Sequence, residues 1–436
     1  MELGVYDERR TPMKNHRLAL LAAVVLVACS GCGGAGTAGV DLAAAAVPRA
    51  SADPAGAIDA AKALDALGLD LYRKLATGSG NVVFSPASIG LALSMARAGA
   101  KGTTAAQMDT VMRAMASDDH AAWVNALDTA LDSRTGTFKD VAGKDQPVTL
   151  RIANAPFAQR DMKLVSTYLD ALASRFGAGL RLVDYKKDFE AARKAIDAWV
   201  SDQTEQRIPE LIAEGDLDDM TRLVLVNAIY LKAAWQMPFS ADLTKPASFT
   251  KVDGSTIQVP TMAATEEFRY AEGAGWKAVE LPYVGGSLAM TVIVPDDLAA
   301  FEASLDTDAL GKITGALSTR NVDLTMPKFG IETRADLGAT LTALGMTDAF
   351  DPNRADFSGM TTDERLYISK VIHQANIDVD EKGTTAAAAT AVEIRAMALP
   401  ADPVTLHVDR PFLFLVRDVP TGAILFMGRT TEPAVR

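Results

Sequence analysis

The sequence predicts an α+β fold built in one large domain. Two segments, "AAQMDTVMRAM" and "FEAARKAIDAWVSDQTEQ", place apolar residues at helical spacing, and both fall in the first half of the chain. The second half carries "RLVLVNAIYLKAAW", "SLAMTVIVPDD", "RNVDLTMPKFGIET" and "PFLFLVRDVPTGAILFMGRT", which are rich in β-branched and aromatic residues. Helices and strands do not alternate regularly. This order favours α+β with large sheets over a doubly wound parallel sheet.

Composition agrees with a globular domain and excludes several classes of function. The chain has 436 residues, of which 49% are apolar and 22% charged, so material for a core is ample. A net charge of −12 without any basic run argues against nucleic-acid binding. Both cysteines lie before residue 33, so the body of the chain has no disulfide, cysteine nucleophile or Cys-based metal site. We expect neither a metal nor a cofactor.

The N-terminus has the pattern of an export signal. From Met13, "MKNHR" is followed by a short apolar stretch and then by Leu-Val-Ala-Cys, which ends at Cys29. This ending resembles the lipobox of bacterial lipoproteins, in which the cysteine is lipidated and becomes the new N-terminus. We therefore interpret residues 1–28 as a start placed too early plus a signal peptide, and Cys29 as a lipidation site. An ordinary secretory signal or an uncut anchor is the alternative; each places the protein outside the cytoplasm.

The rest of the chain divides into a tether and one domain. Residues 29–56 are low in complexity and rich in Gly, Ala and Ser, which predicts a flexible tether and no packed element. Helical periodicity begins near residue 58, and no second linker follows. The predicted domain therefore spans residues 57–436, and the only expected membrane contact is through the N-terminal anchor.

Candidate catalytic residues are few. Of four histidines, His16 leaves with the signal, His120 is expected at an exposed helix start, and His373 and His407 are expected as hydrogen-bonded polar groups in strands. Residues 57–436 contain no HExxH, G-x-S-x-G, P-loop or G-x-G-x-x-G motif. The one S-x-x-K match, at 248–251, precedes a turn, whereas a Ser–Lys pair needs one helix face. The sequence therefore predicts that the protein is not an enzyme.

The segment Gly383–Ala391, "GTTAAAATA", is unusual in that every side chain is small. Its alanines favour a helix by propensity, and its composition also suits a flexible linker. A third interpretation is a strand that can enter a sheet without a steric barrier, since the following "VEIR" alternates apolar and polar residues. One parity then carries the side chains Thr384, Ala386, Ala388, Thr390, Val392 and Ile394. The residues alone leave all three interpretations open.

The segments around this stretch resemble the serpin family. "LYISKVIHQANIDVDEKGTTAAAATAVEI" is similar to the family's hinge, and "NVVFSPASIGLALSMARAGAKGTT" to its N-x-x-x-SP-x-SI segment. "LVNAIYLKAAWQMPFSADLTKPASF", "LTMPKFGIET" and "VDRPFLFLVRDVPTGAILFMGRTTEP" resemble further family segments, in order and at matching spacing. The resemblance covers essentially all of 57–436.

The resemblance implies a three-sheet fold with about nine helices, a metastable native state and an exposed reactive loop. It also implies a single-use, irreversible inhibitor: a serine protease forms an acyl-enzyme with the loop, which then inserts into the central sheet and traps the protease in a covalent 1:1 complex. The chain itself is expected to be a monomer. The hinge of this loop corresponds to Glu381, Gly383, Thr384, Ala386, Ala387, Ala388 and Ala389.

Two further clusters follow from the resemblance. By position, Ser85, Ser88, Asn227 and His373 match the family's shutter, a polar cluster beneath the strands that part. Trp235 and Thr244 match the breach, where the loop first enters the sheet. We expect the shutter to be a hydrogen-bonded latch and not a catalytic triad.

Counting from Glu381 as the seventeenth residue before the cut places the reactive bond at Met397–Ala398. Methionine suits elastase-like, chymotrypsin-like or subtilisin-like proteases, which accept unbranched apolar side chains. The alternative bond Arg395–Ala396 suits trypsin-like enzymes with an acidic pocket. The competing function is a non-inhibitory serpin that serves as a binding or carrier protein. Bulky or charged residues in the hinge would favour that alternative, and Gly383 to Ala389 contain none.

Overall fold

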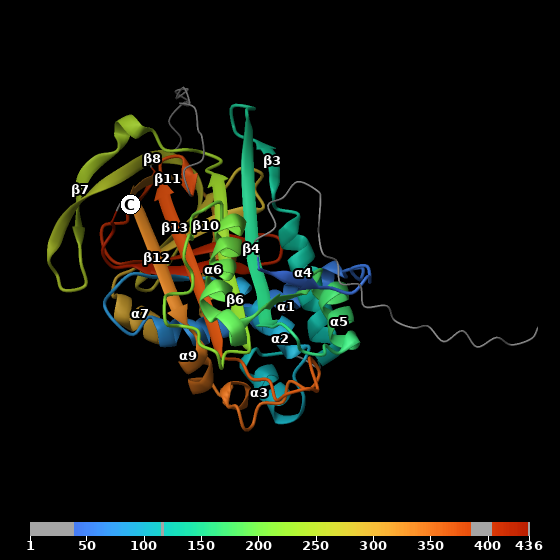
Figure 1. Cartoon of the computed structure of the whole chain (residues 1–436). Helices are drawn as coiled ribbons and strands as arrows, with labels where there is room; N and C mark the ends of the chain where they lie inside the picture. Colours follow the sequence, from blue (N-terminus) through green and yellow to red (C-terminus); the bar gives the residue numbers. More distant parts are fainter. Residues whose placement is uncertain (1–38, 115–116, 385–402, 435–436) are drawn as a thin grey trace, which may run out of the picture.

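The computed structural model describes residues 39–114, 117–384 and 403–434, and it confirms the α+β class (Figure 1). In these residues the α-helices are α1 (Pro54–Leu75), α2 (Pro86–Arg97), α3 (Gly102–Val111), α4 (Ser117–Asp132), α5 (Ser166–Phe176), α6 (Tyr185–Gln203), α7 (Leu298–Ser304), α8 (Thr307–Ala316) and α9 (Gly338–Ala343). Two short 3-10 turns, η1 (Ala241–Leu243) and η2 (Asp348–Phe350), complete the helical part. The expected number of about nine helices is therefore confirmed for the described residues.

The described strands form two hydrogen-bonded sheets. The eight-stranded sheet contains β1 (Asp41–Ala43), β3 (Gly136–Lys139), β4 (Asp145–Gln159), β5 (Leu180–Val183), β6 (Leu223–Ala234), β12 (Phe329–Asp336), β13 (Lys370–Asp380) and β14 (Gly383–Thr384). The nine-stranded sheet contains β2 (Val82–Phe84), β7 (Lys245–Thr250), β8 (Thr256–Gly273), β9 (Trp276–Pro282), β10 (Leu288–Pro295), β11 (Ser318–Pro327), β15 (Val404–His407), β16 (Phe412–Asp418) and β17 (Ile424–Thr430).

Two sheets are found where three were expected, and the long strand β8 is the reason. Its Thr256–Thr261 end pairs with β7, whereas its Arg269–Gly273 end pairs with β9. Strand β11 pairs along β8 between these ends and carries β15 on its other edge. The two strand groups at the ends of β8 are thus joined into one continuous sheet.

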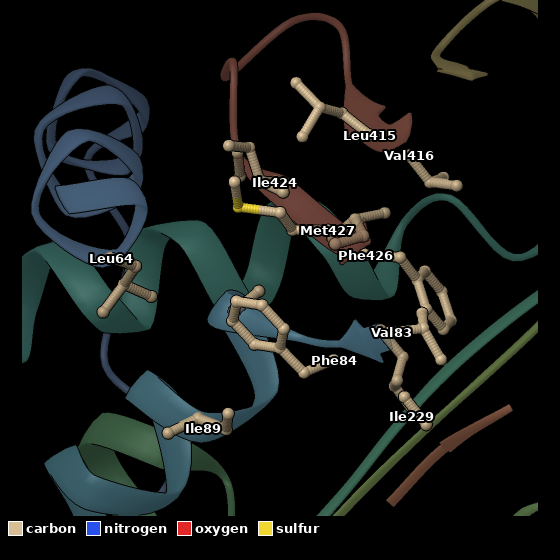
Figure 2. Close-up of a cluster of buried hydrophobic side chains, with 14 of the residues drawn as sticks. Leu64, Val83, Phe84, Ile89, Ile229, Leu415, Val416, Ile424, Phe426 and Met427 are labelled. Atoms are coloured by element: carbon tan, nitrogen blue, oxygen red, sulfur yellow. The ribbon is translucent and has the colours of Figure 1, made fainter. Parts of the chain in front are cut away.

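The eight-stranded sheet is a central layer with a different cover on each face. Along β6, Val224, Val226 and Ala228 face helix α6, which lies across this sheet in Figure 1 and packs Ile196 and Trp199 against them. The alternate residues of β6 face the main core. Figure 2 shows Ile229 of β6 in this core with Phe84, Ile89, Phe426 and Met427, from β2, α2 and β17. A register shift of one residue would therefore exchange the side chains of β6 between these two packed faces.

Helix ends agree with their local sequence. Helix α1 begins after Asp53, whose side chain accepts a hydrogen bond from the Ala55 amide, with Pro54 in the first turn. Helix α5 ends at Gly177, which adopts the left-handed conformation at φ 57°. A hairpin around Pro420–Gly422 joins β16 to β17. Among the described residues, no helix has the length and apolar character needed to cross a membrane.

The structure differs from the expected flexible tether over the described part of residues 29–56. Residues 39–53, called the N-terminal strap below, contain β1, which pairs antiparallel with β5 at the edge of the sheet. Helix α1 then begins at Pro54. These residues pack despite their low complexity, because the edge of a sheet presents unpaired backbone groups. A strand can pair with them through its own backbone without needing particular side chains.

Candidate functional site

The central sheet is split between β6 and β13. The two strands pair in parallel where Lys370–Ala375 face Val224–Ile229. At the opposite end β14 lies between them: Gly383 and Thr384 pair antiparallel with Ala234 and Ala233 of β6 and with Asp380 and Val379 of β13. Because a strand lies between them there, β6 and β13 are about two strand spacings apart, roughly 9–10 Å. The chain therefore turns back after β13 and enters its own sheet with two residues.

Thr384 is held by an aromatic plug at this entry. Its hydroxyl lies 2.5 Å from the Tyr283 hydroxyl, and both residues are buried. The Tyr283 ring stacks on Trp235, with ring centroids 4.5 Å apart. Trp235 in turn donates its indole N–H to the Asp380 carbonyl at 2.9 Å. The plug thus binds both the inserted threonine and the strand that precedes it.

Gly383 occupies a position that only glycine can fill. Its φ is 152°, and a Cβ there would lie 2.1 Å from the Ala233 carbonyl oxygen and 2.8 Å from the Ala234 Cα. Both obstacles are backbone atoms of β6 and cannot move aside as a side chain would. The first turn of the hinge therefore depends on the absence of a side chain.

Glu381 anchors the turn that leads into β14. Its carboxylate accepts a hydrogen bond from the Thr244 hydroxyl at 2.8 Å and forms an ion pair with Lys328 at 2.8 Å. Burial raises the pKa of Glu381, but the contacts with Lys328 and Thr244 outweigh it, so the pKa lies below its ordinary value. The structure thus brings the predicted Trp235 and Thr244 to the entry of the slot.

The predicted shutter residues also lie together, under the paired end of β6 and β13. His373 and Asn227 are register partners, and His373 Nδ1 lies 2.5 Å from Asn227 Oδ1. The Ser85 amide donates to His373 Nε2 at 3.0 Å. Nε2 must therefore carry the lone pair and Nδ1 the proton, which assigns a neutral tautomer. Burial lowers the pKa of His373 to about 3.

The two serines complete this cluster through a residue that the sequence did not single out. Ser85 Oγ accepts from the Ser88 amide at 3.1 Å and so caps α2. Ser88 donates to Asn154 Oδ1 at 2.8 Å, and the Asn154 amide donates back to the Ser88 carbonyl at 2.9 Å. Asn154 is the register partner of Asn227. Side chains from β4, β6 and β13 therefore form one polar row, which is fixed to the start of α2.

Three functional candidates were missed: Tyr283, Lys328 and Asn154. Lys328 lies in one of the strand segments predicted from the sequence, whereas Asn154 lies in β4, which none of those segments covers. Nothing in the local pattern of either residue links it to the hinge. Only the alternation of "NAP" in a strand, which turns Asn154 toward the core, was available as a signal. Tyr283 lies in a connection after β9, where the sequence has no periodic pattern.

Some of the remaining predicted residues lie among the described residues and others do not. Cys29, Ala386, Ala387, Ala388, Ala389, Arg395, Ala396, Met397 and Ala398 lie outside the described residues. The prediction of an exposed His120 is wrong: it is buried in α4, 3.3 Å from the Ser94 hydroxyl, and burial lowers its pKa. His407 accords with its prediction, because it lies in β15 and its Nδ1 is 2.8 Å from the Thr325 hydroxyl.

The described residues contain no group of three or more His, Cys, Asp or Glu side chains that could hold a metal ion. His373 faces an amide oxygen and a backbone N–H, with no serine hydroxyl on its acceptor nitrogen. The cluster is therefore arranged as a hydrogen-bonded brace between strands. A nucleophile–base pair would require a hydroxyl at Nε2.

The fold and site together define a class: an α+β protein whose central sheet is split and receives the two residues of β14 from the segment that follows β13. The family comparison names that class. A family model described as "Serpin (serine protease inhibitor)" matches residues 62–433, and the chain therefore belongs to the serpin family.

Similarity to named relatives covers most of the chain. Plasminogen activator inhibitor 1 of Sus scrofa is 35% identical over 385 residues, which cover 86% of this chain and 92% of the relative. Leukocyte elastase inhibitor A of Rattus norvegicus is 36% identical over 379 residues, which cover 84% and 97%. Both relatives are named as inhibitors.

Solved structures agree on the fold. The thermophilic serpin tengpin in its native state matches with a TM-score of 0.77 at 25% identity, covering 88% of this chain and 96% of tengpin. Native protease nexin-1, solved with heparin, matches with a TM-score of 0.75 at 30% identity, covering 87% and 100%. Uncleaved ovalbumin has a TM-score of 0.75 at 25% identity, covering 86% and 100%. The serpin fold is thereby confirmed.

Proposed function

We propose that this protein is an irreversible, single-turnover inhibitor of serine proteases that traps its target by inserting the cleaved reactive loop into the eight-stranded sheet. The observation that carries the proposal is β14: the first two hinge residues already lie between β6 and β13. A sheet that admits these residues in the intact chain has a slot in line with the rest of the hinge. The protein acts as a substrate that is consumed, and it is not itself an enzyme.

The orientation of Thr384 supports insertion of the residues that follow. Thr384 faces the core side, because its hydroxyl meets the buried Tyr283. In a continuing strand, side chains of the same parity face the same way. Ala386, Ala388, Thr390, Val392 and Ile394 would then face the core, while Glu393 and Arg395 would face the other side. The smallest residues would enter first.

Insertion would require β6 and β13 to separate where they now pair directly. Six register pairs, from Lys370–Val224 to Ala375–Ile229, join β6 directly to β13. A full inserted strand replaces these contacts by two new ladders. The polar row of Asn154, Asn227 and His373 lies in this zone, so we propose that it is the latch that must part.

For the reactive bond we propose Met397–Ala398, with Arg395–Ala396 as the alternative. The relatives named leukocyte elastase inhibitors support an elastase-like target, the class that Met397 suits. A methionine side chain fills an apolar pocket, whereas an arginine needs a carboxylate at the base of the pocket.

The test is a denaturing gel of the chain without residues 1–32, which retains every described residue, after mixing with elastase, chymotrypsin, subtilisin or trypsin. We expect an adduct that survives detergent, together with a released peptide that begins at Ala398. A peptide that begins at Ala396 would move the reactive bond to Arg395. Clipping by every protease without adduct, while the protease stays active, would contradict inhibition and favour the binding or carrier alternative.

Two matched variants separate the candidate bonds. Met397→Asp should abolish the adduct with elastase-like enzymes, because a charge cannot enter an apolar pocket. Arg395→Ala should leave that adduct unchanged. The reverse pattern, with the trypsin adduct lost in Arg395→Ala, would assign the bond to Arg395.

We further propose that the protein lies outside the cytoplasm, anchored through a lipid on Cys29. The support is the sequence pattern alone. The test is expression of the full chain in a bacterium, with detergent partition and mass spectrometry of the N-terminus. Lipidated Cys29 as the first residue is the expected result, and Cys29→Ser should shift the protein to the aqueous phase. Cleavage at another residue would indicate an ordinary secreted form.

A further inference from the structure

The N-terminal strap connects the outer edge of the split sheet to the helices beneath it. At one end, β1 pairs with β5 through Asp41–Leu182, Leu42–Arg181 and Ala43–Leu180. Strand β1 is the last strand on the β6 side of the slot, in the order β1, β5, β4, β6, β14, β13, β12. The strap is therefore attached to the part of the sheet that has to separate from β13.

The strap is also attached to the end of β4. Arg160, which follows β4, donates to the Gly39 carbonyl at 3.0 Å and forms an ion pair with Asp41 at 3.0 Å. Val40 packs against the cluster between α6 and the sheet. The first residues of the strap thus contact β4, β5 and the cluster under α6.

At its other end the strap is clasped by α4 and α5, which lie side by side in Figure 1. Arg49 binds Asn125 at 2.7 Å, Asp128 at 2.5 Å and Asp132 at 3.1 Å, all on α4. The Ala50 amide donates to the Ser174 carbonyl of α5 at 2.8 Å. Four residues later the strap enters α1. This end is therefore fixed to three helices.

Two glycines give the strap its seat. A Cβ at Gly177 would lie 3.3 Å from Arg49. A Cβ at Gly179 would lie 2.8 Å from the Ala43 carbonyl oxygen, 2.8 Å from Leu42 Cδ1 and 3.1 Å from Ala44 Cβ. All three of the atoms closest to Gly179 belong to the strap. The absence of a side chain at Gly179 therefore serves the contact with the strap in particular.

From this arrangement we propose that the N-terminal strap restrains the width of the eight-stranded sheet and slows insertion of the reactive loop in the uncleaved chain. The inference rests on the proposed function, because it concerns the same insertion. Insertion of one strand displaces β4, β5 and β1 from β13 by about one strand spacing, roughly 4.8 Å. Since the strap joins these strands to α4, α5 and α1, such a displacement would strain or break the contacts of the strap.

The test compares point variants of the full chain with the wild type. Gly179→Ala pushes only on the strap, and Arg49→Gln removes the charge from the clasp on α4. Gly311→Ala is the matched control, because no atom lies within 4 Å of a Cβ at Gly311 in helix α8. Each protein is incubated uncleaved, and conversion is followed as resistance of the 385–402 segment to subtilisin, with mass spectrometry confirming an intact chain.

We expect Gly179→Ala and Arg49→Gln to convert about ten times faster than the wild type, a ratio that corresponds to about 1.4 kcal/mol. Gly311→Ala should convert at the wild-type rate. Equal rates in all four proteins would overturn the role of the strap. If the strap contributes only to general stability, the two strap variants will melt at a lower temperature than the wild type, by the same amount in the intact and the loop-cleaved forms, and will convert no faster. This result would overturn the role as well.

The same samples distinguish the failure of this inference from the failure of the proposed function. If the wild-type chain gains no thermal stability after its loop is cleaved, the sheet does not accept the loop and the proposed function fails. If the cleaved wild type is stabilised but the strap variants convert no faster, only the inference about the strap fails.

Discussion

At the scale of single residues, Thr384 is the point at which chemistry decides whether the loop can enter the sheet. It is 1% exposed, and its hydroxyl meets the buried Tyr283. A small polar group is satisfied there by one hydrogen bond, whereas a charged group has no partner of opposite sign among the contacts of this plug. Burial of an unpaired charge costs several kcal/mol.

We therefore expect Thr384→Arg to turn the protein from an inhibitor into a substrate. Its loop should still be cleaved at the same bond, because the cleavage site lies many residues away. The adduct fraction on a denaturing gel should fall at least about tenfold, which corresponds to about 1.4 kcal/mol favouring hydrolysis over insertion. Thr384→Ser keeps the hydroxyl and should retain most of the adduct. An undiminished adduct in Thr384→Arg would show that this position stays outside the sheet.

Asp65 is a second residue whose environment has a measurable consequence. It lies partly buried on α1, where its carboxylate accepts a hydrogen bond from the Ile424 amide at 2.9 Å. Burial raises its pKa to about 7, although the Ile424 amide and the charge of Arg417 oppose this. The folded state therefore keeps a proton that the unfolded chain loses near pH 4. Between pH 4 and 7 this group makes the free energy of unfolding fall as pH rises.

We expect Asp65→Asn to raise the melting temperature most at pH 8 and progressively less as the pH falls from 7 toward 4. Asparagine keeps the acceptor for Ile424 and resembles the protonated acid. The measurement is thermal unfolding of both proteins from pH 5 to 8, with the difference between them as the readout. A difference that is constant across this range would contradict a carboxyl group with a raised pKa.

At the scale of elements, the important feature is the row of polar side chains across β4, β6 and β13. Asn154, Asn227 and His373 occupy paired register positions, and the start of α2 fixes them through Ser85 and Ser88. The row is specific for a closed sheet, because each hydrogen bond requires neighbouring strands at their present spacing. Separation of β6 from β13 would therefore break hydrogen bonds between buried polar groups.

This row should make the closed sheet sensitive to acid. Burial lowers the pKa of His373 to about 3, whereas the unfolded chain titrates near 6.5. Below pH 6.5 the His373 imidazole binds a proton in the unfolded state but not in the folded state. The free energy of unfolding therefore falls as the pH falls from 6.5 toward 3. Asp65 contributes a slope of opposite sign, and the two must be separated by variants.

We expect His373→Gln to destabilise the protein at pH 7.5 by about 1–3 kcal/mol, through loss of buried hydrogen bonds. In the Asp65→Asn background, the same substitution should remove the loss of stability that occurs as the pH falls from 6.5 to 4.5. Urea unfolding at several pH values, in the Asp65→Asn background, measures the His373 contribution alone. An equal pH slope with and without His373 would contradict this assignment.

At the scale of the whole molecule, the structure is a sheet with one strand position only partly used. β14 contributes two residues to a slot whose walls, β6 and β13, extend over 12 and 11 residues. Completion of this strand would add hydrogen bonds along both walls. Roughly ten net hydrogen bonds at about 1 kcal/mol each suggest a gain on the order of 10 kcal/mol.

We therefore expect cleavage of the loop to stabilise the protein. At about 2 °C per kcal/mol for a large domain, the melting temperature should rise by roughly 20 °C. The measurement is calorimetry of the wild type before and after limited proteolysis within residues 385–402. The Thr384→Arg variant, cleaved in the same way, should show little increase, because its strand cannot enter. A cleaved wild type that melts at the same temperature as the intact protein would rule out insertion.

The predictability of this molecule varies with the range of the interactions concerned. The predicted hinge, shutter and breach residues were located by the resemblance of contiguous segments. The structure places Trp235, Thr244 and the hinge residues up to Thr384 at the entry of the slot, and it places the shutter residues under the paired end of β6 and β13. The hinge residues after Thr384 lie outside the described residues. Tyr283 and Lys328 were missed because they reach Thr384 and Glu381 from segments that are distant in the sequence. His120 was misplaced because a polar segment gave no indication that Ser94 and α2 cover it.

The prediction of a flexible tether over the residues of the strap was wrong for a related reason. Its sequence is poor in strand formers, and a three-residue strand such as β1 has no periodicity to detect. Pairing there depends on the free edge of β5, on Arg160 and on the room at Gly179. None of these is adjacent in sequence to the strap.

By itself, the sequence determined the α+β class, the small side chains of the hinge and the absence of cysteine chemistry from the body of the chain, because each depends on residue type or local period. Only the tertiary structure decided that two hinge residues already lie between β6 and β13, that His373 is a neutral brace and that the N-terminal residues hold the edge of the sheet. These features arise from hydrogen bonds and packing between residues far apart in the chain, and the fold must form before such groups can meet.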